Sequence, residues 1–101
     1  MGKFLGAIAQ PAGTPAGSFM LFDPGGASVC LRHLSITTDT AQLVRVQVRG
    51  RTIRSAYVGP GGWVWDWCEG LDLAELGQVG PLVVTTSVAS LIEAQADGDV
   101  A

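Results

Sequence analysis

The chain has 101 residues, the size of one domain, and its content of 48% hydrophobic and 15% charged residues excludes an intrinsically disordered protein. Its net charge of −3 argues against nucleic acid as a partner, because phosphate recognition needs clustered Lys and Arg side chains. A surface with so few charges exposes neutral and apolar area, which favours a protein that binds partners.

Residues 1–26 are rich in Gly, Ala and Pro, and this composition predicts an extended N-terminal arm with one short strand at 19–22. The first half of the arm has too few large apolar side chains to fold alone, so its order is expected to depend on another chain. Its expected anchors are Phe4, Leu5 and Ile8. Removing residues 2–12 is therefore expected to leave the remaining domain, residues 27–101, folded.

The same segment superficially matches a signal peptide, because Lys3 precedes a short apolar run that contains small residues. That run holds only about half of the roughly 7–15 apolar residues that a signal peptide needs. No stretch of the chain approaches the ~18 apolar residues of a membrane span. We therefore expect a protein that is made in the cytoplasm and has no membrane partner.

Strand signals dominate the rest of the chain. Residues 27–39 predict a long strand rich in β-branched side chains, and in residues 41–50 three valines alternate with polar side chains. Gly50 permits a tight turn, so residues 51–59 are expected to complete a hairpin. The basic side chains of this hairpin are Arg45, Arg49, Arg51 and Arg54. They are interpreted as the solvated face of two adjacent strands.

Residues 63–67 predict another strand, residues 70–81 a loop, and residues 82–96 one or two further strands. Residues 96–101 are interpreted as a frayed terminus. In total, the sequence predicts about six to eight short strands, with turn signals every ~8–12 residues and little helix. This pattern predicts an all-β fold, an antiparallel β-sandwich or barrel of the jelly-roll or immunoglobulin-like type.

Three tryptophans occupy alternate positions of the strand predicted at 63–67 and therefore share one face. They are Trp63, Trp65 and Trp67. Three interpretations stay open: the core of the domain, an anchor between subunits, or a platform that stacks on the sugar rings of a glycan. A glycan platform also needs converging polar groups, and only Asp66 and Glu69 are near in the sequence.

Cys30 and Cys68 lack the spacing of a zinc motif and, with His33 as the single histidine, are too few for a four-ligand site. They are expected to be two buried free thiols, or a disulfide if the protein meets an oxidising environment. A bridge would close a ~39-residue loop and add roughly 4 kcal/mol to stability. His33 is interpreted as a strand residue without a catalytic partner, and no metal, cofactor or enzymatic activity is expected.

Three segments in this order carry a resemblance to known proteins: LRHLSITTDTAQLVRVQVRG, GPGGWVWDWCEGLDL and GPLVVTTSVASLIEAQA. Over roughly residues 29–95 the chain resembles the small β-sandwich structural proteins of tailed bacteriophages. The resemblance implies a virion protein that decorates and cements the capsid exterior, or another small head, neck, spike or tail subunit. The implied partners are the major capsid protein or other virion subunits, and further copies of this chain. A glycan-binding β-sandwich module is the alternative from another functional class.

Overall fold

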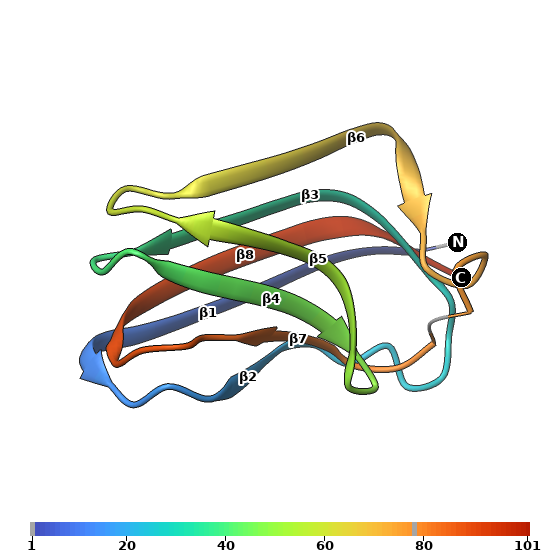
Figure 1. The fold of residues 1–101 in the computed structure, drawn as a ribbon. Helices are drawn as coiled ribbons and strands as arrows, with labels where there is room; N and C mark the ends of the chain where they lie inside the picture. The colour runs from blue at the N-terminus through green and yellow to red at the C-terminus, as the bar shows by residue number, and fades with distance from the viewer. Residues whose placement is uncertain (1, 78) are drawn as a thin grey trace.

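The computed structural model describes residues 2–77 and 79–101, which form eight β-strands and no helix (Figure 1). In chain order the strands are β1 (Gly2–Thr14), β2 (Ser18–Phe22), β3 (Val29–Thr38), β4 (Gln42–Val48), β5 (Arg51–Val58), β6 (Trp63–Asp72), β7 (Leu82–Thr85) and β8 (Ser90–Val100). The predicted all-β fold with little helix is confirmed.

The strands form two four-stranded antiparallel sheets that pack face to face (Figure 1). The first, which we call sheet A, has the strand order β1-β8-β3-β6, and the second, sheet B, has the order β2-β7-β4-β5. The chain changes sheet at every connection except the one between β4 and β5. This arrangement is a jelly roll, one of the two sandwich types that the sequence predicts.

The β4–β5 hairpin forms as its sequence predicts. Val44, Val46 and Val48 of β4 are fully buried, and the side chains between them lie on the outer face. The turn has positive φ angles at both Arg49 (53°) and Gly50 (79°). A two-residue type I′ turn requires such angles at both positions, and it matches the twist of the strands that it joins.

Apolar side chains from both sheets fill the space between them. Besides the three valines of β4, the largest fully buried apolar side chains are Leu31, Leu34, Ile36, Val58, Leu73, Leu82, Val84 and Ile92. Burial of one such side chain contributes about 1.5–3 kcal/mol to the free energy of folding. The sandwich is therefore stabilised by alternate positions of strands from both sheets.

The buried amide of Gln42 joins two turns at one end of the sandwich. Its Nε2 donates to the hydroxyl oxygens of Thr38, 3.0 Å away, and Ser90, 2.7 Å away. Its Oε1 accepts from the backbone N–H groups of Ser87 and Val88. Because buried polar groups are costly when unpaired, this network fixes the β3–β4 and β7–β8 connections relative to each other.

The N-terminal arm expected over residues 1–26 is not confirmed. Its first part is the edge strand β1, which pairs with β8 along most of its length. Phe4 is only 7% exposed and stacks on Phe22, with ring centroids 4.3 Å apart. A Cβ atom at Gly6 would collide with the backbone of Leu21, so glycine allows β1 and β2 to approach closely. This segment therefore belongs to the core of the sandwich.

The frayed terminus expected over residues 96–101 is wrong. Strand β8 continues to Val100 and lies between β1 and β3 in sheet A. A Cβ atom at Gly98 would collide with the carbonyl oxygen of Cys30, so this glycine permits close strand packing. Asp99 is only 8% exposed, because it faces two cationic side chains described below.

Candidate functional site

The Trp stripe, defined as Trp63, Trp65 and Trp67, lies on β6, an edge strand of sheet A. Trp65 and Trp67 are half-buried and pack against the core, whereas Trp63 is 45% exposed. The rings of Trp63 and Trp65 are neighbours, with centroids 6.0 Å apart and planes tilted by 57°. The stripe therefore has one solvent-exposed ring and two rings that belong largely to the interior.

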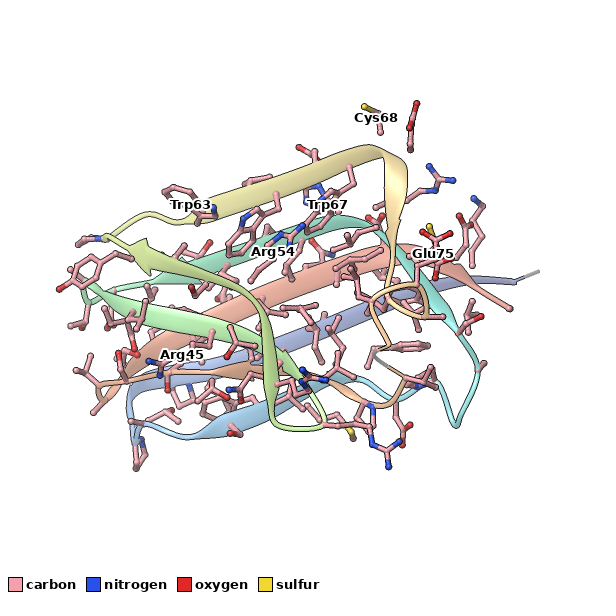
Figure 2. The ribbon with its side chains drawn as sticks, turned by 45° about the vertical axis from the view of Figure 1, so that its right-hand side comes forward. Arg45, Arg54, Trp63, Trp67, Cys68 and Glu75 are labelled. Carbon is pink, nitrogen blue, oxygen red and sulfur yellow. The ribbon has the colours of Figure 1, made fainter. Side chains whose placement is uncertain are left out.

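Arg54 connects the stripe to the other sheet. It lies on β5, and its Cζ atom is 5.7 Å from the ring centroid of Trp67, a cation–π contact (Figure 2). Because β5 and β6 are edge strands of opposite sheets, this contact closes the side of the sandwich between them. Arg54 is half-buried there, so it does not lie on the solvated face on which the sequence places all four arginines of the hairpin.

The three expected N-terminal anchors have different environments. Phe4 is part of the core, and Ile8 is half-buried against it. Leu5 is 65% exposed, because alternate side chains of a strand point to opposite faces. Of these three residues, Leu5 is the one that offers a large apolar surface to a partner.

The two cysteines are free thiols. Both lie in sheet A, Cys30 on β3 and Cys68 on the neighbouring strand β6. Cys30 is half-buried, and the residue of β6 that packs against its sulfur is Gly70. Cys68 is exposed and points away from the sandwich (Figure 2). The bridge that the sequence allows is not formed, and the expectation that both thiols are buried is wrong.

His33 has a carboxylate partner that sequence reasoning did not identify. Its Nδ1 atom is 2.6 Å from Oδ1 of Asp66, the residue opposite it on β6. No serine or cysteine of the described ranges, 2–77 and 79–101, forms a hydrogen bond with this imidazole. The pair therefore lacks the nucleophile of a triad and bridges two strands of sheet A.

Asp99 of β8 joins the two neighbouring strands of sheet A, β1 and β3. Its Oδ1 accepts from Nζ of Lys3 at 3.2 Å, and its Oδ2 accepts from Nε of Arg32 at 2.8 Å. Arg32 also donates to the carbonyl oxygen of Cys68 on β6. The hydrogen bonds from Arg32 and then Lys3 lower the pKa of the Asp99 carboxyl. The hydrogen bond to Asp99 likewise raises the pKa of Arg32.

We expect the stability of the protein to fall in acid as Asp99 becomes protonated. A carboxyl whose pKa is lower in the folded state stabilises the fold above its unfolded pKa of ~3.9, and this contribution is lost as the pH falls through the folded-state value. Asp99→Asn should therefore lower the melting temperature at pH 7, and the difference from wild type should shrink towards pH 2. Asp97→Asn is the control, because Asp97 has no ion-pair partner among the described residues. A pH-independent difference for Asp99→Asn would contradict this assignment.

A shallow hollow of about 380 Å³ lies on the outer face of sheet A. It is lined mainly by Ala7, Ala9, Ser35, Thr37, Glu93 and Gln95. The strand register places these residues in two adjacent rows across β1, β8 and β3. The small side chains of β1 make the hollow, which sequence reasoning missed because it requires knowledge of the strand order.

In the part of the chain that the structure describes, no group of three or more His, Cys, Asp and Glu side chains could hold a metal ion. No helix long and apolar enough to cross a membrane occurs there either. Comparisons with protein-family models, curated proteins and solved structures find no match for this chain.

Proposed function

We propose that this chain is a structural subunit of a virus particle, a capsid decoration protein that binds the outside of the shell and stabilises it. The observation that supports this most is the strand order of the two sheets, because the eight-stranded jelly roll is an architecture of viral capsid proteins. Lectin and cupin domains share this architecture, so the support is an analogy of fold.

Exposed apolar side chains give the second support. Leu5, Met20, Tyr57 and Val64 are each more than half exposed. Leu5 and Val64 belong to sheet A, and Met20 and Tyr57 belong to sheet B. A subunit that is repeated on a shell can cover such side chains at its contacts, and many modest contacts then add up through avidity.

The glycan-binding alternative has less support, because the Trp stripe is not a flat platform. Trp65 and Trp67 pack against the core, and Trp63 is the exposed ring of the three. Stacking on a sugar would therefore rest on one indole at the edge of the sandwich. In this alternative, Trp63→Ala abolishes glycan binding and leaves the fold intact.

The proposed role is tested with particles assembled with and without the gene for this chain. Particles that lack it are expected to release their genome at a lower temperature, and added purified chain is expected to restore their resistance. Leu5→Asp should weaken this restoration, because it places a charge on an apolar contact, whereas the exposed control Glu75→Gln should not. Particles of unchanged thermal stability, with or without the chain, would contradict the cementing role.

A further inference from the structure

The two sheets of the sandwich differ in charge. Four of the six cationic side chains belong to β4, β5 or the turn between them: Arg45, Arg49, Arg51 and Arg54. Six of the nine carboxylates belong to β6 and β8: Asp66, Glu69, Asp72, Glu93, Asp97 and Asp99. No strand of sheet B contains Asp or Glu. Arg54 turns to Trp67, and Arg51 lies opposite the buried Val48, so Arg45 is the arginine of β4 and β5 that belongs to the outer face of sheet B. The outer face of sheet A is acidic, with Asp66, Glu93 and Asp97.

Arg45 is near the centre of the outer face of sheet B. It lies on β4 opposite Ser55 of β5 and Thr85 of β7, between the buried Val44 and Val46, so its side chain points outwards (Figure 2). It has no ion-pair partner among the described residues. On the same face, diagonal to Arg45, Tyr57 is 69% exposed. Arginine and tyrosine are enriched among the residues that dominate protein interfaces.

Glu93 lies on the acidic outer face of sheet A and is the proposed counterpart of Arg45. It lines the hollow and lies between Ala9 of β1 and Thr37 of β3. Its carboxylate likewise has no ion-pair partner within 2–77 and 79–101. Glu93 pairs with Thr37, and both Thr37 and Arg45 are within about four residues of the 39–41 turn, so Glu93 and Arg45 lie towards the same end of the sandwich. A hollow floored by small side chains leaves room for a side chain that projects from a neighbour.

We propose that copies of this chain associate head to tail, with the outer face of sheet B of one copy on the outer face of sheet A of the next. Arg45 of one copy then pairs with Glu93 of its neighbour at the hollow, with Tyr57 beside the pair. Charge favours this arrangement, because two acidic faces would repel each other in a two-fold dimer, and a two-fold contact between two sheet B faces would offer Arg45 no carboxylate from a strand of sheet B. A head-to-tail contact leaves one face of each kind free, so the assembly grows into a ring or a filament.

The size of the molecule is compatible with such a contact. The Cα atoms span 37 × 24 × 19 Å, so a sheet face offers on the order of several hundred Å², close to the ~800 Å² that each partner contributes to a standard interface. Exposed apolar side chains lie on both sheets, Met20 on β2 and Leu5 on β1. The inference concerns contacts between copies and can therefore fail while binding to a shell holds.

The test is a reciprocal charge reversal followed by sedimentation of the purified full chain over a concentration series. Wild type is expected to exceed the mass of a monomer, and to do so less in high salt, because salt screens exposed charges. Arg45→Glu and Glu93→Arg should each weaken association by about tenfold or more. An equimolar mixture of the two variants should regain the wild-type mass, because every contact between unlike copies again pairs an arginine with a glutamate.

The matched control is Glu75→Arg, the same charge reversal in the turn after β6, away from both faces (Figure 2). This variant should sediment like wild type. The melting temperatures of all variants are expected to match, since Arg45 and Glu93 are exposed. A wild type that stays monomeric at about 1 mM would overturn the proposal. So would a mixture of the two variants that fails to recover, or a loss in Glu93→Arg no larger than that in Glu75→Arg.

Discussion

Removal of residues 2–12 is expected to unfold the protein. The deletion takes away all of β1 except its last two residues, and with it the pairing to β8 and the Phe4 ring that stacks on Phe22. The free energy of unfolding of such a domain is about 5–15 kcal/mol. The loss of an edge strand that contains a buried aromatic ring is expected to remove more than this amount. Far-UV circular dichroism of the truncated chain should therefore lose the signal of a folded β-sheet protein.

Two point variants at neighbouring positions distinguish the contribution of β1 to the core from a contact of β1 with a partner. Phe4→Ala should lower the free energy of unfolding by roughly 3–5 kcal/mol, because it leaves a cavity beside Phe22. Leu5→Ala, one residue further on the exposed face, should change it by less than ~0.5 kcal/mol. Equal effects of the two substitutions in urea denaturation would show that β1 does not pack as described.

Trp65→Ala is expected to lower the free energy of unfolding by roughly 3 kcal/mol, the lower end of the range for buried aromatic residues, because Trp65 is half-buried against the core. The control is Val64→Ala, since Val64 is 56% exposed on the opposite face of β6. Urea denaturation followed by tryptophan fluorescence measures both. A Trp65→Ala variant as stable as wild type would show that the stripe does not contribute to the core.

The sequence predicts best the strands in which apolar and polar side chains alternate. In β4 the three valines alternate with polar residues, and Gly50 marks the turn, so local pattern and tertiary burial agree. The strand that carries the Trp stripe is predicted for the same reason. Its extension to Asp72 is not, because Gly70 and the acidic side chains after Trp67 resemble the start of a loop.

The two ends of the chain are missed for a physical reason. Nearly half of the residues of β1 are Gly or Ala, whose small side chains give little hydrophobic contrast between the two faces of a strand. The sequence Asp97-Gly98-Asp99 resembles a turn, but Asp99 is satisfied by Lys3 and Arg32, which are distant in the sequence. Contacts of this kind override local propensity and depend on a strand order that periodicity alone does not determine.

The order of the strands in the sheets also decides which charged side chains lie together on one surface. The basic cluster of the β4–β5 hairpin is visible in the sequence, whereas the acidic face combines β6 and β8, which are separated along the chain by β7. Likewise, the pairing of His33 with Asp66 follows from the register of β3 and β6. Sequence patterns thus predict which residues share a strand face, and the topology decides which faces meet.

Electron cryomicroscopy of particles assembled with and without the gene for this chain tests the central claim, a repeated subunit on a viral shell, most directly. The difference between the two maps should show a small two-layered β-sandwich on the outer surface of the shell, repeated at symmetry-related positions. Maps without such a difference, from particles to which the purified chain has been added in excess, would contradict the claim.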